Sequence, residues 1–462
     1  MRNVKSKTWQ NRGVEIAKPD SKRKKSSVKH TRAVQHDRSQ RTNSEPTEEA
    51  IRGHLLDIVH PATLAQVGLY QSLGLRARSL TLPVMVALIV SLIWRQMGSV
   101  SELARVVNRE AVMWVPRMKI SAQAINERLR TIPAVLFLQV LVEALPVFQR
   151  RWEERKRPVP EAMAWVRERY GRVLICDGST LDALMRKTGL LIEGAEKVLA
   201  GRMIGVLDAL SRLPVWIGYT DDEAAHDQNF WGDILEHVTR GALLIFDLGY
   251  TNYERFAHMT RDGITFLTRA KRNMAYTVVD VIERTAAQHD LIVWIGDPAK
   301  ATQQQVRLVR LLYQGKWYEY LSNELDPERL PALILLAVYR QRWRIEDAFS
   351  TTKSLLGLSY FFCGADNAIR LQVWATWLLY AVLVDLSDSV AEALSRPFAD
   401  ISMEMVFRAL PFYVRAAHRK ETDDLLAFLV ADYKLFGLVK RKRPTTSSKQ
   451  RLQPPLTDEW IP

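Results

Sequence analysis

Apolar residues recur every three or four positions from about Glu48 to Phe148, which predicts amphipathic helices throughout this stretch. Ser99 and Ser121 each follow a break in the pattern, and we expect them to cap the helices that begin after them. We therefore predict an α-helical domain over residues 48–150. The clearest members of the apolar series are Ile51, Leu55, Ile58 and Val59, and then Ile125, Leu129, Ile132 and Leu136.

Two runs are more apolar than the rest, Leu82–Trp94 and Trp377–Leu386. Both are too short to span a bilayer, so we expect buried helices and no membrane partner. The helical domain also carries several arginines that are expected to be exposed, which would allow it to read a DNA groove. A packing or dimerisation domain is the alternative. These arginines are Arg105, Arg109, Arg128 and Arg130.

Beyond Glu161 the pattern changes to short β runs, separated by two helical segments at 227–238 and 252–258. The predicted order is β-β-β-α-β-α-β, which is the strand order of a ribonuclease H-like core. The first and fourth strands are neighbours in that topology, so Asp177 and Asp247 would stand side by side. Two adjacent carboxylates repel unless a cation joins them, which predicts a divalent metal site. The predicted strands are 172–177, 202–208, 213–218, 242–247 and 264–268.

Polar and apolar residues alternate within 272–321, which predicts a β-strand insertion inside the core. The core is then expected to cover 161–271 and 322–400, followed by a helical region over 401–443. The fold class is thus α/β, with a ribonuclease H-like core, a β-strand insertion and an α-helical N-terminal domain.

Four polar residues after the insertion fall on one helical stripe: Tyr339, Arg342, Glu346 and Lys353. At about 100° per residue, their offsets of 0, 3, 7 and 14 place them within an arc of roughly 60°. Such a face can hold a metal ion through Glu346 beside a phosphate gripped by Arg342 and Lys353. The alternative is a solvated helix face with ordinary ion pairs.

Composition points to an anionic polymer or surface as the partner. The 462 residues carry a net charge of +14, and 47% of them are hydrophobic, enough for two or three domains. Residues 1–44 hold thirteen Lys and Arg against three acids and predict a disordered basic arm, or else a tail that only aids solubility. Residues 444–462 are also predicted to be disordered. Two cysteines exclude a disulfide framework and a Cys-rich zinc module, which fits a cytoplasmic protein.

Three motifs in order resemble the DDE transposases of the IS4 family of bacterial insertion sequences. They are Asp177-Gly-Ser-Thr, Asp247-Leu-Gly-Tyr-Thr-Asn and Tyr339-x2-Arg342-x3-Glu346-x6-Lys353, separated by 70 and 99 residues between the acids. The resemblance covers roughly residues 90–400. Enzymes of this family also carry a β-strand insertion before the catalytic glutamate.

The resemblance implies that Asp177, Asp247 and Glu346 are the catalytic residues and hold two Mg²⁺ (or Mn²⁺) ions, with Asp177 bridging them. It implies excision through a hairpin at the transposon end, followed by joining to target DNA, by a homodimer on double-stranded DNA at the nucleoid. Tyr339, Arg342 and Lys353 would grip phosphates of the terminal inverted repeat. An aromatic residue would stack on a splayed base, and Trp317, Tyr318 or Trp343 could serve, although core packing is the favoured role for any one of them.

Two other functions remain open. A structure-specific nuclease could use the same core, and a DNA-binding regulator could descend from a transposase that has lost its chemistry. The intact acids and the intact stripe disfavour the regulator. Three other polar residues are expected to be structural: His226 as a helix cap, Asp208 in local hydrogen bonds, and Cys176 in the core.

Overall fold

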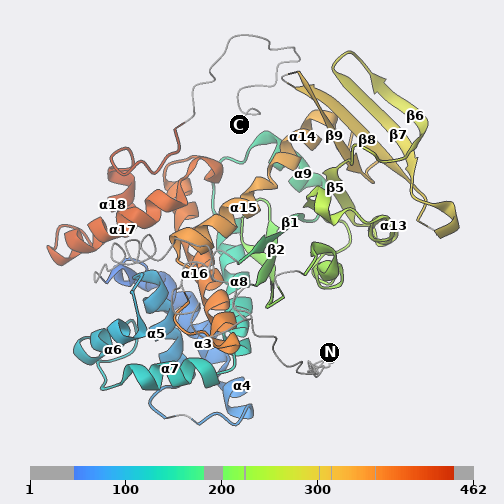
Figure 1. Ribbon diagram of the computed structural model, residues 1–462. Coiled ribbons are helices and arrows are strands. Elements are labelled where there is room, and N and C mark those ends of the chain that lie inside the picture. The colour runs from blue at the N-terminus through green and yellow to red at the C-terminus, as the bar shows by residue number, and fades with distance from the viewer. Residues whose placement is uncertain are drawn as a thin grey trace, which may run out of the picture.

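The computed structural model describes residues 46–441, except for 77, 182–200, 223–224, 301, 314 and 359–360. The predicted basic arm (1–44) and C-terminal tail (444–462) lie outside the described residues. The protein has a helical N-terminal part, a large mixed sheet, and helices that pack on both faces of the sheet (Figure 1).

The N-terminal part is helical, as the apolar spacing predicts. Ser99 and Ser121 cap α6 and α7 through their side-chain oxygens, in agreement with the sequence analysis. Helix α5 is apolar on all sides and is almost wholly buried, which explains why its sequence shows no polar face. The helices are α2 (Arg52–His54), α3 (His60–Ala65), α4 (Val67–Ser72), α5 (Leu82–Trp94), α6 (Val100–Arg109), α7 (Ala122–Thr131) and α8 (Val135–Glu154), with short 3-10 and π turns η1 (Thr47–Glu49) and η2 (Leu55–Val59).

Nine strands form one continuous sheet in the order β3-β2-β1-β4-β5-β9-β8-β7-β6. β1 runs antiparallel to β2 and parallel to β4, and β4 runs parallel to β5. The prediction that the first and fourth strands are neighbours is therefore confirmed. The strands are β1 (Val173–Thr180), β2 (Arg202–Asp208), β3 (Pro214–Thr220), β4 (Leu243–Phe246), β5 (Thr265–Arg269), β6 (Thr277–Arg284), β7 (Gln288–Ile295), β8 (Gln304–Tyr313) and β9 (Lys316–Ser322).

The strands predicted as an insertion form a meander that extends the core sheet. β9 pairs with β5 from Leu267 opposite Ser322 to Arg269 opposite Tyr320, so the hydrogen-bonded ladder is unbroken. β6 was not predicted, because its side chains are largely exposed on both faces and two register shifts interrupt its pairing with β7. The meander lies at the far end of the molecule from the N-terminal helices (Figure 1).

Alternation along β1 separates the two faces of the sheet. Leu174 and Cys176 join the core beneath α12 (Trp231–Leu235) and α13 (Tyr253–Arg261), whereas Val173 and Ile175 join the larger core on the other face. Cys176 is fully buried, as predicted. Asp177 follows in register and therefore belongs to the face with Val173 and Ile175.

The motif predicted as a single helix is divided into three segments. α14 (Ala332–Arg340) ends before Arg342, α15 (Trp343–Ser350) begins after it, and a π-helical turn, η6 (Thr351–Leu355), contains Lys353. The amides of Arg342 and Ile345 bond to carbonyls three residues back, so the chain is tightened at the break. The expectation of one straight stripe is wrong in this respect.

Helix α16 (Asp366–Ala393) runs through the centre of the molecule and packs on α8. It contains the run 377–386 but is far longer than that run, and by length and composition it could cross a membrane. However, 94% of its most apolar window is buried inside the protein, as in the core helix of a soluble domain. The pair α7 and α8, bent by 78°, passes the same test of composition. Helices α9 (Glu161–Arg169), α17 (Met403–His418) and α18 (Leu425–Ala431) complete the helical part.

Candidate active site

Asp177 and Asp247 lie on two adjacent strands, Asp177 within β1 and Asp247 directly after β4. The last residues paired between β1 and β4 are Cys176 and Phe246, and each aspartate directly follows its member of this pair. β1 continues to Thr180, so Asp177 lies within the strand rather than at its end. The predicted side-by-side placement of the two acids therefore follows from the pairing register.

Helix α15 packs close to β1 because a glycine faces it. Gly205 is paired with Asp177 across β1 and β2, and a β-carbon there would lie 3.3 Å from Ile345 Cδ1 and 3.4 Å from Phe349 Cζ. These two side chains fill the place that a larger residue would take. The close approach brings Glu346, next to Ile345, near Asp177, so that both acids bind Arg342. The sequence pattern gave no sign of this role for Gly205.

Arg342 is the centre of the site. Its Nη1 donates to Asp177 Oδ2 at 2.6 Å, and its Nη2 donates to Glu346 Oε1 at 2.8 Å. Its Nε lies 4.0 Å from Asp247 Oδ1 and has no hydrogen-bond acceptor among the described residues. Because the side chain is only 8% exposed, the guanidinium is enclosed by the three carboxylates that were predicted to hold metal.

Burial and the attraction of opposite charges have opposing effects on the pKa values of Asp177 and Arg342. Burial raises the pKa of Asp177 to about 6, against the attraction of Arg342 and a bond from the Gly178 amide, while Asp247 and Glu346 raise it further. Burial also opposes the charge on Arg342, but the surrounding groups, Asp177 first, raise its pKa above the usual value. Three acids with one guanidinium leave negative charge in excess, so the site favours additional cations.

Tyr339 and Lys353 form hydrogen bonds at or close to the two aspartates. The Tyr339 hydroxyl donates to Asp247 Oδ1 at 3.5 Å, and its ring packs on Tyr320 at 5.0 Å between centroids. Burial, followed by the charge of Asp247, raises the pKa of Tyr339, which keeps the hydroxyl a donor. Lys353 Nζ donates to Ser179 Oγ at 2.7 Å and to the Thr180 carbonyl at 3.2 Å.

The two tryptophans proposed to contact DNA lie in different places. Trp343 is 59% exposed, and the Arg342 guanidinium carbon lies 5.0 Å from its ring centroid, so it borders the carboxylate cluster. Trp317 is at the start of β9 and is 38% exposed, and it packs on His289 of β7 and Arg310 of β8. Nothing in these contacts joins Trp317 to the carboxylates.

A fourth acid, close to the three of the cluster, was missed by the sequence analysis. Asp227 forms an ion pair with Arg202 beside Gly178, and a β-carbon at Gly178 would collide with Asp227 Oδ1. The only signal in the sequence is that Asp227 begins a predicted helix directly after His226. His226 caps that turn by accepting from the Gln228 amide, and the Asp208 side chain accepts local hydrogen bonds from Leu210 and Ser211, as predicted for both.

The three carboxylates suit a hard cation chemically, but the Arg342 guanidinium lies between them. All three acids offer carboxylate oxygens, the ligands that Mg²⁺ and Mn²⁺ prefer. Among the described residues, no three His, Cys, Asp or Glu side chains lie close enough together to hold a metal ion as they stand. The residues thus fit divalent ions in chemistry and charge, provided that the guanidinium turns away.

Residues 172–382 match a family model described as a transposase DDE domain. This segment begins one residue before β1, ends within α16 and contains Asp177, Asp247, Arg342 and Glu346. The carboxylate cluster therefore lies inside the segment that matches the transposase DDE domain.

Two individual proteins are similar to the chain. The "Putative transposase y4zB" of Sinorhizobium fredii (strain NBRC 101917 / NGR234) is 30% identical over 152 residues, which is 32% of this chain. The match covers 43% of that relative's length. A solved structure of the piggyBac transposase synaptic complex with hairpin DNA aligns over 89% of this chain and 87% of its own, with a TM-score of 0.40 and 10% identity.

Proposed function

We propose that this protein is a transposase that cleaves the ends of an insertion sequence and joins them to target DNA. The observation that carries the proposal is the convergence of Asp177, Asp247 and Glu346 on one buried arginine, inside the DDE domain. The order β3-β2-β1-β4-β5 supports a ribonuclease H-like core, and the three motifs of the sequence support the IS4 group.

Asp177, Asp247 and Glu346 would hold two divalent ions, Mg²⁺ or Mn²⁺, with Asp177 shared between them. Such ions stabilise negative charge on the attacking and leaving oxygens of a phosphoryl transfer. Arg342 supplies positive charge to the three acids. With divalent ions on the three acids, the Arg342 fork would be free to grip a phosphate in bidentate fashion.

The DNA would lie across the exposed side of this cluster. Trp343 borders Arg342 and is the best placed aromatic to stack on a splayed base, while Trp317 would contact DNA further out on the meander. Tyr339 and Lys353 would position phosphates close to their hydrogen-bond partners, Asp247 after β4 and Ser179 on β1. Two copies of the chain, each holding one terminal inverted repeat at the nucleoid, would form the synaptic complex.

The N-terminal helices (48–150) are proposed to add DNA contacts. Arg105, Arg109 and Arg130 are exposed there. Arg128 is turned inward, since it donates to the Leu80 carbonyl and to Tyr70 Oη, so its role is structural.

The test is a gel assay with purified protein, a labelled duplex ending in the terminal repeat that flanks the gene, a target plasmid and Mg²⁺. We expect the wild type to cleave the end and join it to the plasmid. Glu346→Gln should bind the end but not cleave it, because a neutral amide is a poor ligand for a divalent ion. Asp347→Asn is the matched control: it is the next residue, it is exposed and paired with Arg344, and it should cleave normally.

The outcomes distinguish three functions. If the wild type cleaves the labelled end but does not join it to the plasmid, the protein is a structure-specific nuclease. If the wild type binds the end without cleaving it, the protein is a DNA-binding regulator. Full cleavage by Glu346→Gln would refute the site assignment.

A further inference from the structure

The two aspartate motifs contain glycines and an asparagine that the proposed metal site does not use. In the first motif Gly178 directly follows the aspartate, and in the second Gly249 and Asn252 come two and five residues after it. All three lie against one short turn, η3 (Asp227–Phe230). The structure thus relates both motifs to a single segment that lies between them in the sequence.

Gly178 leaves room for an ion pair on the strand that carries Asp177. Asp227 of η3 pairs with Arg202 of β2 directly over Gly178. A β-carbon at Gly178 would collide with Asp227 Oδ1 and would lie 3.2 Å from Arg202 Nε. By alternation Gly178 is on the same face of the sheet as Cys176, the face on which α12 packs. The ion pair therefore packs on β1 from the side opposite α15.

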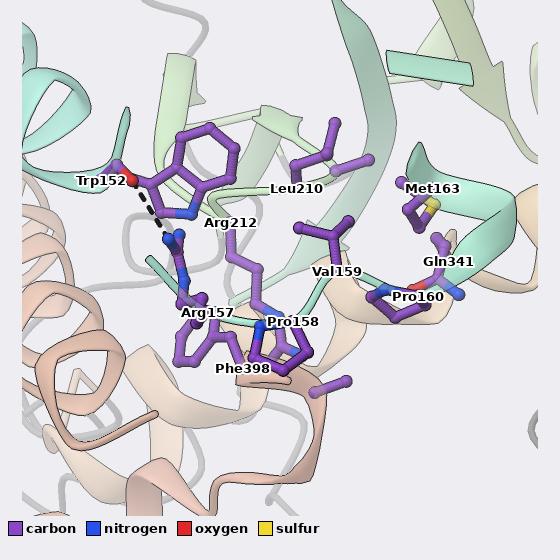
Figure 2. A pocket seen from close by; sticks show the side chains of 12 residues that line it. Trp152, Arg157, Pro158, Val159, Pro160, Met163, Leu210, Arg212, Gln341 and Phe398 are labelled. Atoms are coloured by element: carbon purple, nitrogen blue, oxygen red, sulfur yellow. Dashed lines mark hydrogen bonds between the residues drawn. The ribbon is translucent and has the colours of Figure 1, made fainter. Parts of the chain in front are cut away.

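The ion pair between Arg202 and Asp227 is largely shielded from water. The two side chains are 19% and 18% exposed, so breaking the pair would leave a poorly solvated charge without its partner. A comparable pair fixes the helical part of the protein: Arg157, beside the small cavity shown in Figure 2, pairs with Asp388 of α16 at 2.5 Å. The pair at η3 instead holds a turn against a strand of the proposed active site.

Gln228 joins the same turn to the segment that follows Asp247. Its Nε2 donates to the Gly249 carbonyl at 3.3 Å and to the Thr251 carbonyl at 3.1 Å. Its Oε1 accepts from Asn252 Nδ2 at 3.3 Å, so both ends of the amide are bonded to this segment. Two consecutive residues of η3 therefore bridge the two strands whose aspartates are the proposed metal ligands.

We propose that Asp227 and Gln228 are positioning residues that set the spacing of Asp177 and Asp247 for binding divalent ions. This inference rests on the proposed function and concerns the same site. Acids that hold two ions about 3.5 to 4 Å apart must keep a defined separation. Strand pairing alone does not fix this separation, because Asp247 lies beyond the last residue pair of β1 and β4. The bridge through η3 supplies the missing constraint.

The experiment measures binding of Mn²⁺ to the full-length protein, from the electron paramagnetic resonance signal of the unbound ion. Asp227→Asn removes the ion pair with Arg202, and Gln228→Met removes the bridging amide without changing the charge. Each should weaken Mn²⁺ binding by about tenfold or more, as is usual when residues that orient metal ligands are replaced. Asp233→Asn makes the same substitution at an exposed residue of α12 and should bind Mn²⁺ like the wild type.

Cleavage of the terminal repeat at increasing Mn²⁺ concentration gives a second readout. Half-maximal cleavage by Asp227→Asn and by Gln228→Met should need about tenfold more Mn²⁺, and the rate should recover toward the wild-type value at saturating Mn²⁺. A merely structural role would lower the rate by the same factor at every Mn²⁺ concentration. Binding of the repeat in EDTA should be unchanged in both variants, which shows that they are folded.

Two results would overturn the positioning role. One is wild-type affinity for Mn²⁺ in both variants. The other is a loss confined to one variant: in Asp227→Asn alone it would be an effect of charge, and in Gln228→Met alone it would leave the ion pair without a role. Neither result affects the transposase proposal, because cleavage and joining by the wild type are measured separately. If the wild type neither binds Mn²⁺ nor cleaves, the proposed function fails and the positioning role fails with it.

Discussion

Replacing Asp177 by asparagine should stabilise the metal-free protein at pH 8, although it removes a residue of the proposed active site. Asn keeps the shape of a protonated aspartate and has no charge to bury. Burial is the main cause of the raised pKa of Asp177, about 6, and that value already includes the attraction of Arg342. The substitution therefore removes a net cost of folding.

The sign and size follow from linkage. An unfolded aspartate has a pKa of about 3.9, so the folded protein holds the proton more tightly than the unfolded chain does. The stability contributed by protonated Asp177 is complete below about pH 4 and is lost as the pH rises through 6. A difference of about two pKa units corresponds to about 3 kcal/mol at pH 8. For a chain of this length the melting temperature would shift by about 3 °C.

Thermal unfolding between pH 4 and pH 8 in EDTA measures this effect for the wild type, Asp177→Asn and Asp347→Asn. The advantage of Asp177→Asn should be near zero at pH 4 and should grow to its full value above pH 6. Asp347→Asn makes the same change at a side chain that is 61% exposed, so a trend shared by both variants belongs to the substitution itself. If Asp177→Asn melts below the wild type at pH 8, the ion pair with Arg342 outweighs burial and the reasoning is wrong.

Three further predictions concern DNA and packing. Arg342→Lys keeps the charge but loses the fork, so end binding and cleavage should fall together by about tenfold or more; gel-shift and cleavage assays showing wild-type values would contradict this. Gly205→Val should press α15 away from β1, cost about 1 to 3 kcal/mol in urea unfolding and reduce cleavage, whereas Gly232→Val, at a glycine with no atom within 4 Å of its β-carbon position, should do neither. Deleting residues 1–44 should lower affinity for DNA at low salt and flatten the dependence of log K on log salt, and an unchanged slope would show that the segment makes no phosphate contacts.

The sequence determined the secondary structure and the pairing of the two aspartates. Helix periodicity, serine caps and short β runs are local signals, and they identified the N-terminal helices and the strands β1–β5 to within a few residues. The adjacency of Asp177 and Asp247 also followed, since the order of elements restricts which strands can be neighbours. The spacing of Tyr339, Arg342, Glu346 and Lys353 predicted that their side chains would converge.

Only the tertiary structure decided what these side chains meet. Arg342 was expected to face phosphate, but its two Nη atoms donate to Asp177 and Glu346, because these carboxylates need a nearby cation that no local pattern can assign. The closeness of α15 to β1 depends on Gly205, whose role appears only when Ile345 and Phe349 are packed against it. The joining of β9 to β5 likewise arises between segments distant in sequence. Periodicity reports which face of an element is buried, whereas long-range packing decides which groups share that burial.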